Sequence, residues 1–257
     1  MTNDLLQFES RGPIAVVWLN RSEKRNALSD GLVLELRRAF ESLSSDVRAV
    51  VLSARGHHFS AGLDLGELTE RDPGQGLLHS RMWHQALDAI QYGCAPVIAA
   101  LHGAVVGGGL ELAAACHVRV ADETTYYALP EGTRGIFVGG GGSVRIPKLI
   151  GTARMTDMML TGRVYNAAEG ERVGLAQYLV PAGDSFRRAM ELAERVIQNA
   201  PMSNYAITHA LPRIAEQAAD HGYLTEALVT AITQSAPEAK QRVNDFLEGR
   251  AARVVAP

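Results

Sequence analysis

His102-Gly103-Ala104-Val105-Val106-Gly107-Gly108-Gly109-Leu110-Glu111 joins two segments of different character in this chain of 257 residues. Before it, residues 96–101 form a short apolar run opened by proline, which predicts a buried strand. After it, residues 110–115 are strong helix formers. The glycines therefore lie at a strand-to-helix junction, where unpaired N–H groups and the helix dipole favour an anion. Because glycine lets an acceptor approach closely, we predict an oxyanion site here.

Two glutamates belong to glycine-rich segments. Glu111 lies in the first turn of the predicted helix, and Glu131 follows Pro130 and precedes the run 139–142. Together they predict acid/base chemistry beside an anion-stabilising backbone. The alternatives are that the first glycines only allow tight packing and that Glu131 is a solvent-facing turn residue. A dinucleotide loop at 139–142 would need a G-x-G-x-x-G frame and a following acidic residue, which the sequence does not clearly match.

A third segment resembles the first in its layout. Residues 48–53 predict another buried strand, which runs through Gly56 into 59–65, a turn of small residues. Two strand ends then offer backbone N–H donors. A single donor positions a carbonyl oxygen, whereas two converging donors stabilise an enolate or a tetrahedral oxyanion.

Four ordered motifs together resemble the crotonase (enoyl-CoA hydratase/isomerase) superfamily. They are residues 20–28, 59–65 and 102–111, and Pro130-Glu131 with its glycine run. The resemblance implies an α/β fold, with a crotonase-like (ClpP/crotonase) spiral core of repeated ββα units over residues 1–182, for acyl-CoA binding and catalysis. It also implies a C-terminal α-helical trimerisation region over residues 183–257, and a homotrimer or homohexamer.

The same resemblance implies roles for single residues. Glu111 would act as the base toward water and Glu131 as the proton donor to the α-carbon. The amides of Leu63 and Gly108 would hold the thioester oxygen, and Gly139 would lend an N–H to the water. The implied acyl-pocket residues are Trp83 and His84. The implied contacts to substrate and coenzyme A are Lys24, Arg25, Ala27, Ala61, Asp64, Leu65 and Phe246. The expected cofactor is none beyond the coenzyme A of the substrate.

His84 has a second interpretation. The tripeptide Trp83-His84-Gln85 stands at the same point in 4-chlorobenzoyl-CoA dehalogenases, where the histidine is a base. Those relatives have a nucleophilic aspartate where this chain has Gly139, and they lack both glutamates. We therefore do not expect dehalogenation, and we assign His84 to the pocket lining.

Three functions remain open at this point. The first is an enoyl-CoA hydratase, a lyase that adds water to a 2-enoyl-CoA. The second is a hydrolase or isomerase on the same scaffold, because residues 131–145 resemble methylthioacryloyl-CoA hydratases, which also cleave the thioester. The third is a non-catalytic acyl-CoA-binding protein, against which the two glutamates argue. An isomerase needs only one carboxylate, so the presence of two glutamates argues against an isomerase.

Composition and charge exclude several classes of binding partner. The net charge is −3 and no basic stripe with interleaved aromatics occurs, so we expect no nucleic-acid partner. Glycine and proline interrupt the uncharged stretch 89–110, and residues 1–11 lack a signal-peptide pattern, so neither membrane insertion nor secretion is expected. Cys94 and Cys116 are predicted to be reduced, buried thiols of a cytoplasmic protein. The histidines lack metal-binding spacing, so no metal is expected.

Hydrophobic periodicity predicts strand and helix in alternation, followed by a helical tail. The predicted strands are 14–19, 49–52 and 96–101, and the predicted helices of the core are 27–43, 74–93 and 110–115. The predicted helices of the tail are 186–199, 201–219, 223–235 and 237–251.

Overall fold

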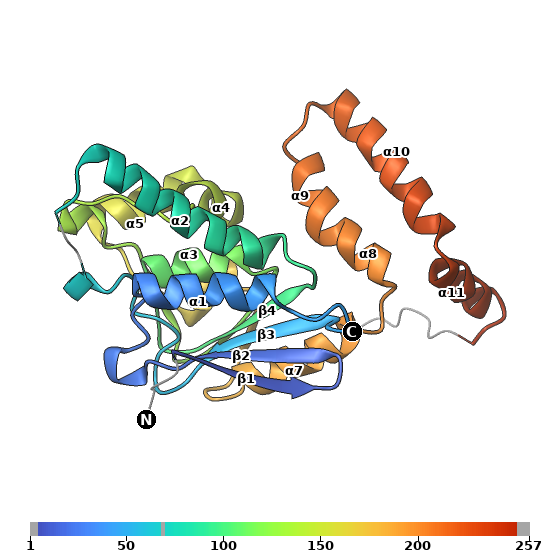
Figure 1. The fold of residues 1–257 in the computed structure, drawn as a ribbon, viewed down its shortest axis with the longest axis horizontal. Coiled ribbons are helices and arrows are strands. Elements are labelled where there is room, and N and C mark those ends of the chain that lie inside the picture. The colour runs from blue at the N-terminus through green and yellow to red at the C-terminus, as the bar shows by residue number, and fades with distance from the viewer. Residues whose placement is uncertain (1–4, 68–69, 251–257) are drawn as a thin grey trace. The chain divides into compact units, whose positions relative to one another are not determined.

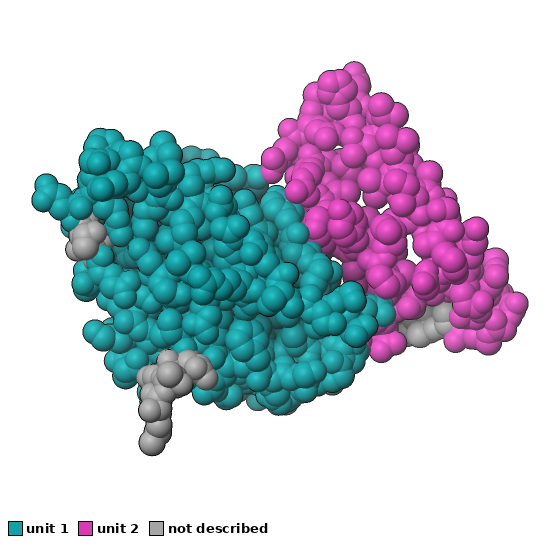
Figure 2. All heavy atoms as spheres, in the orientation of Figure 1, with its two compact units in different colours: residues 1–196 teal, residues 197–257 magenta. Residues whose placement is uncertain are grey.

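The computed structural model describes residues 5–67 and 70–250, which form two compact units, Met1–Val196 and Ile197–Pro257 (Figure 2). The first unit contains both sheets and the second is helical. Each unit is described by itself below.

Two sheets organise the first unit. The larger has the strand order β1-β2-β3-β4-β6-β9 and the smaller the order β5-β7-β8. In the larger sheet β1 and β2 pair antiparallel, and every following pair is parallel. The strands are β1 (Leu6–Arg11), β2 (Ile14–Leu19), β3 (Ala49–Ala54), β4 (Val97–Leu101), β5 (Ala104–Val106), β6 (Val118–Asp122), β7 (Tyr126–Ala128), β8 (Tyr165–Asn166) and β9 (Tyr178–Val180).

The chain advances as a spiral whose turns each contribute to two layers. β4 joins the large sheet and is followed by β5 in the small one, and β6 and β7 repeat this arrangement. Earlier turns do the same with single parallel bridges, Leu28 to Leu63 and Ser60 to Val105. Successive turns therefore stack, which confirms the predicted crotonase-like spiral of ββα units.

Helices cover both faces of the large sheet. In Figure 1, α1, α2 and α3 lie above the strands, and α7 lies below them against β3, β4 and β6. Both faces of β3 and β4 are buried, as expected of parallel strands that read as continuous apolar runs. The helices of this unit are α1 (Asp30–Glu41), α2 (Pro73–Gln91), α3 (Gly108–Ala115), α4 (Gly142–Ile150), α5 (Thr152–Thr161), α6 (Ala167–Val173) and α7 (Ser185–Val196).

The unit boundary differs from the sequence prediction. We expected residues 1–182 and 183–257, but α7 belongs to the first unit, which ends at Val196. The reason is the apolar face of α7, where Ala189 and Ala193 are fully buried against the sheet. A strongly amphipathic helix beside an uncovered sheet face packs on that face first.

The second unit differs from the three helices predicted for it, at 201–219, 223–235 and 237–251. It comprises α8 (Pro201–Tyr205), a π-helical turn (Ala206–Ala210), α9 (Leu211–Ile214), α10 (Ala219–Ser235) and α11 (Pro237–Leu247). The π turn interrupts the predicted helix 201–219 just before Pro212, which has no N–H to donate to the preceding turn. The end of the predicted helix 237–251 lies outside the described residues.

Other expectations concern what the fold contains. Within the described ranges, no helix combines the length and the apolarity that crossing a membrane requires. The same ranges hold no group of three His, Cys, Asp or Glu side chains placed to bind a metal ion. Cys116 is buried as predicted, but Cys94 is exposed because it lies in the turn between α2 and β4, which corrects the expectation of two buried thiols.

Asn26 ties its own segment, residues 21–26, to the turn formed by residues 55–58. It is fully buried, and its Oδ1 accepts a hydrogen bond of 2.8 Å from the Arg21 amide. Its Nδ2 donates to the carbonyls of Arg55 at 2.8 Å and His58 at 2.7 Å. Its backbone has φ of 52°, a left-handed conformation that asparagine tolerates better than most residues.

We expect Asn26→Ala to lower the free energy of unfolding by about 2–4 kcal/mol, since three partly buried backbone groups lose their partner and the buried side chain leaves a cavity. Denaturant unfolding of the full chain measures the effect. Asn166→Ala, which removes the exposed cap of α6, serves as the matched control and should cost about 1 kcal/mol. Equal losses in the two variants would contradict the structural role of Asn26.

Candidate active site

One cavity of the first unit gathers residues from four separate segments of the chain. Its volume is about 210 Å³. The walls include both predicted glutamates, both predicted oxyanion amides and the predicted water-binding glycine. The lining residues are Leu63, Arg71, Gly76, His79, Ser80, Trp83, Gly108, Glu111, Glu131, Ile136, Phe137, Val138 and Gly139.

The amides of Leu63 and Gly108 come together because they follow adjacent segments of the spiral. Ser60 bridges to Val105, so the turns that leave these two residues run side by side. A Cβ built on Gly108 would lie 3.5 Å from the Leu63 nitrogen. Within the described chain, neither amide donates to an acceptor. Two unpaired N–H groups thus line one wall of the cavity.

The close approach of these turns depends on Gly62. Its φ is 93°, and a Cβ there would lie 2.6 Å from the carbonyl oxygen of Val106. Any side chain at this position would push the two turns apart. Glycine is therefore required where the sequence motif 59–65 places it.

Glu111 lies on α3 and is 3% exposed. Its Oε1 accepts hydrogen bonds from the amides of Gly140 at 2.8 Å and Gly142 at 2.7 Å. Gly142 opens α4, so the carboxylate also lies at the positive end of that helix. Burial raises the pKa of Glu111, and the two amides oppose this rise by stabilising the charged form.

Glu131 is the second buried carboxyl of the cavity, with 7% exposure. Burial raises its pKa to about 7, and the nearby charge of Glu111 adds to the rise. Its Oε2 is buried and has no hydrogen-bond partner among the described residues. A Cβ on Gly107 would lie 2.7 Å from its Oε1, so the glycine that precedes α3 makes room for this side chain. A carboxyl with this pKa can exchange a proton near neutral pH.

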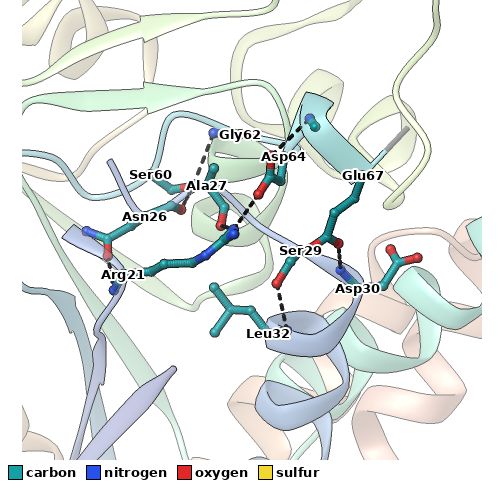
Figure 3. A network of polar contacts seen from close by, with 11 residues as sticks. Arg21, Asn26, Ala27, Ser29, Asp30, Leu32, Ser60, Gly62, Asp64 and Glu67 are labelled. Carbon is teal, nitrogen blue, oxygen red and sulfur yellow. Dashed lines mark hydrogen bonds and ion pairs between the residues drawn. The ribbon is translucent and has the colours of Figure 1, made fainter. Parts of the chain in front are cut away.

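A polar network fixes the segment that carries Leu63 (Figure 3). Arg21 pairs with Asp64 at 2.6 Å and also donates to the carbonyl of Ala27 at 3.0 Å. Arg21 and the amide of Gly66 both bind the Asp64 carboxylate, and the Arg21 hydrogen bond lowers its pKa. The side chain of Asp64 is thus committed to the protein, and its backbone is bonded as well, since its N–H donates to the Leu28 carbonyl at 3.0 Å and its carbonyl accepts from the Glu67 amide at 3.0 Å. Its contact with coenzyme A stays a prediction.

The other residues predicted to contact coenzyme A divide between the two units. Lys24 and Arg25 follow β2, and the Arg25 carbonyl accepts from the amide of Ala61 at 3.0 Å, which brings the motifs 20–28 and 59–65 together. Arg25 also donates to the Tyr126 hydroxyl at 3.0 Å. Leu65 is exposed beside this junction. Phe246 belongs to the second unit, where it is 59% exposed, and its role stays a prediction.

Helix α2 contributes more to the cavity than its sequence indicates. Trp83 lines it as predicted, but His84 is not among the lining residues. His84 instead faces Ser80 and the glycine run, because it lies one residue, or about 100°, beyond Trp83 on the helix. Neither His79 nor Ser80 was predicted to be a site residue. Their spacing of three and four residues before Trp83 is the signal that places them on the same side of the helix.

His79 and Trp83 share a partner on α1. The ring Nε2 of His79 lies 2.6 Å from Asp30 Oδ1, and Trp83 Nε1 donates to the same oxygen at 3.5 Å. Arg71 pairs with Asp30 Oδ2 at 3.3 Å. These contacts hold one end of the cavity wall against α1.

Comparison with known proteins identifies the family to which this geometry belongs. A sequence profile described as enoyl-CoA hydratase/isomerase matches residues 9–254. A crystal structure from Rhodopseudomonas palustris, named as a "putative enoyl-CoA hydratase", has 55% sequence identity and a TM-score of 0.94, covering 98% of each chain. A "putative enoyl-CoA hydratase" of Thermus thermophilus is 35% identical over 97% of this chain and 100% of its own length. The 2,3-dehydroadipyl-CoA hydratase of Escherichia coli is 30% identical over 92% of this chain and 93% of its own length.

The chain belongs to the enoyl-CoA hydratase/isomerase family, the crotonase superfamily that the four sequence motifs indicated. It is an enzyme of the hydratase type, a hydro-lyase. This finding removes the third function considered above, a non-catalytic acyl-CoA-binding protein.

The glycine run offers a test of how tightly Glu111 is held. A Cβ at Gly142 would lie 2.7 Å from Glu111 Cγ, whereas a Cβ at Gly139 would meet only Ser80 Oγ at 3.8 Å. Gly142→Ala should therefore displace Glu111 and lower kcat by roughly 10²-fold. Gly139→Ala is the matched control, with a loss of no more than about fivefold. Steady-state kinetics compare the two, and similar losses would refute this account.

Proposed function

We propose that the enzyme adds water across the 2,3 double bond of a 2-enoyl-CoA thioester. The observation that carries the proposal is a pair of buried carboxyls with raised pKa, Glu111 and Glu131, in one cavity with two unpaired amides. Addition to a conjugated thioester needs a base at the water, an acid at the α-carbon and donors at the carbonyl oxygen. The cavity offers a residue for each of these tasks.

The reaction follows from these positions. The Leu63 and Gly108 amides would donate to the thioester oxygen and stabilise the enolate that forms when water attacks C3. Glu111, held by hydrogen bonds from two backbone amides, would take a proton from that water, and Glu131 would give its proton to C2. One C–O and one C–H bond form, the π bond is lost, and the two carboxyls are left with one proton between them. Because two ionised carboxyls in one buried site would repel each other, the pair keeps one proton. Transfer of that proton from Glu111 back to Glu131 restores the starting state.

The coenzyme A part of the substrate would lie over the junction of the motifs 20–28 and 59–65. Lys24 and Arg25 supply positive charge for its phosphates. Ala27, Ala61, Asp64 and Leu65 would line its path. No metal and no cofactor other than this coenzyme A enters the proposed reaction, which would take place in the cytoplasm.

A second candidate is cleavage of the thioester after hydration. It is favoured by the stretch 131–145, which resembles methylthioacryloyl-CoA hydratases. Assays with a panel of enoyl-CoA substrates, in which loss of the double bond and release of free coenzyme A are measured separately, decide between the two. Release of free coenzyme A at the rate of hydration would favour hydrolysis, and hydration without release would exclude it.

Each glutamate is expected to be essential for proton transfer. Glu111→Gln and Glu131→Gln should each lower kcat by roughly 10²-fold or more, with little loss of folding stability. Full activity in either variant would remove that residue from the mechanism.

The wild-type kcat/KM should also fall as pH rises through about 7, because Glu131 of the free enzyme must carry a proton to act as the acid and loses it there. At lower pH, protonation of Glu111 should reduce kcat/KM. A pH profile of kcat/KM measures both limbs.

We also propose that the second unit joins copies of this chain into a homotrimer or homohexamer. Between residues 197 and 250, only Ala200, Asn204, Thr208 and Gly222 are buried. Leu224, Leu228 and Ile232 are exposed at a spacing of four along α10, and Phe246 and Leu247 are exposed on α11. An apolar stripe on a unit without a core of its own calls for a partner. Closed symmetry lets one such surface serve every subunit.

Truncation after Lys240 should dissociate this assembly and weaken binding of coenzyme A at the same time, if Phe246 borders the site of a neighbouring subunit. Sedimentation and the KM for the enoyl-CoA substrate measure the two effects. A full-length protein that sediments as a 27.6 kDa monomer with full activity would refute the shared site.

A further inference from the structure

One face of α2 holds the glycine run that anchors Glu111. Ser80, His84, Asp88 and Gln91 are spaced by three or four residues, so they lie on the same side of this helix. Ser80 Oγ donates to the carbonyl of Gly139 at 2.6 Å, and His84 Nε2 lies 3.3 Å from Ser80 Oγ. None of these four residues has a role in the reaction proposed above.

The directions of the hydrogen bonds follow from what each group can do. A carbonyl oxygen can only accept a hydrogen bond, so the single hydroxyl proton of Ser80 is donated to the Gly139 carbonyl. The contact with His84 then requires His84 to donate, which means that Nε2 carries the proton. Burial lowers the pKa of His84, and Arg81 and Arg145 lower it further against the opposing effects of the Asp88 charge and of a hydrogen bond to the Gly139 backbone, so a neutral ring with Nε2–H fits. Ser80 is therefore not a nucleophile activated by His84, because such a pair needs the proton to run the other way.

The bond from Ser80 reaches Glu111 through one peptide unit. The carbonyl of Gly139 and the N–H of Gly140 belong to the same planar trans peptide and point in opposite directions. Ser80 holds the carbonyl on one side, and the N–H on the other donates to Glu111 Oε1 at 2.8 Å. A chain of this kind polarises each of its members, which strengthens the N–H as a donor.

The next peptide unit is held from the same helix face. The Gly140 carbonyl accepts from Arg145 Nη1 at 3.0 Å. Arg145 is fixed in turn by Asp88 at 2.6 Å and by Gln91 at 2.6 Å. The carbonyls of Gly139 and Gly140 are thus both held. Gly142 follows two residues later, and its N–H donates the second hydrogen bond to Glu111 at 2.7 Å.

We propose that Ser80 and His84 are positioning residues, which orient the Gly139–Gly140 peptide so that its N–H keeps Glu111 ionised and in place as the base. This inference rests on the proposed role of Glu111. The charged groups that face Glu111 are Glu131 and Arg145, and loss of an amide donor leaves both unchanged. A carboxylate that loses a donor binds its proton more tightly.

The test compares Ser80→Ala with Ser80→Thr, and His84→Leu with His84→Gln, in the full-length enzyme. Ser80→Ala should lower kcat by roughly 5–30-fold with KM within about twofold, because the loss falls on the transition state. It should also move the acidic limb of the pH profile to higher pH. Ser80→Thr keeps the hydroxyl, so its kcat should be close to that of the wild type and well above that of Ser80→Ala. His84→Gln keeps an N–H near the position of Nε2, so its kcat should likewise be well above that of His84→Leu.

Two further measurements make the outcome decisive. In a Glu111→Gln background, Ser80→Ala should have no additional effect on kcat, since both changes act through one group. A crystal structure of Ser80→Ala should show that the contact between Gly140 N and Glu111 Oε1 has opened. An unshifted acidic limb, full additivity or an intact contact would overturn the proposal, as would His84→Gln behaving like His84→Leu.

Failure of the proposed function is a separate result. If the wild type hydrates no enoyl-CoA, the role of Glu111 as the base is lost. The crystal structure of Ser80→Ala then decides by itself whether Ser80 positions the peptide. If the wild type and Glu111→Gln behave as expected but Ser80→Ala matches the wild type, only the positioning role fails.

Discussion

The burial of the Glu111 carboxylate against the amides of Gly140 and Gly142 is the constraint on which the site depends. A charged carboxylate taken out of water is costly unless donors replace the water it loses. Here the donors come from the backbone of a segment some thirty residues further along the chain, at the start of α4. Because the carboxylate lies directly against that backbone, Gly142 has no room for a side chain, and a Cβ at Gly140 would fit tightly between Glu111 and Trp83. The glycine run is thus a consequence of the glutamate as much as of any ligand.

The part of the cavity that Leu63 lines depends on a second polar network (Figure 3). Asn26 and the pair of Arg21 with Asp64 hold the turns around Leu63, so its amide does not have to be ordered by the substrate. Donors fixed in advance stabilise a developing oxyanion without a reorganisation cost at the moment of reaction. The Leu63 and Gly108 residues offer backbone N–H groups to the cavity, and Glu111 and Glu131 offer carboxyls. In the reaction proposed above, an acyl thioester would meet the two amides at its oxygen and the two carboxyls at its double bond.

Much of the fold could be predicted from sequence because the signals were local. The strand 14–19 and the strand 97–101 have the continuous apolar character of buried parallel strands, and both formed where expected. Helix α2 begins after Asp72 and ends before Gly93, close to the predicted 74–93. The short strands β5 and β7 were not predicted, since three residues are too few to show a period. The boundary at Val196 was also missed, because it depends on which surface α7 covers.

The sequence by itself determined the family and the spiral fold, and it singled out the two glutamates that line one cavity, because the four motifs keep their order and their residue types. Only the tertiary structure decided that the glycine run binds Glu111, that Asp64 is held by Arg21, and that His84 faces Ser80 rather than the cavity. The physical reason is that a motif records which groups are present, whereas a hydrogen bond between segments depends on where packing brings their backbones. Helix α2 shows this most clearly, since its contacts with Gly139 and with Arg145 join residues that are more than fifty positions apart.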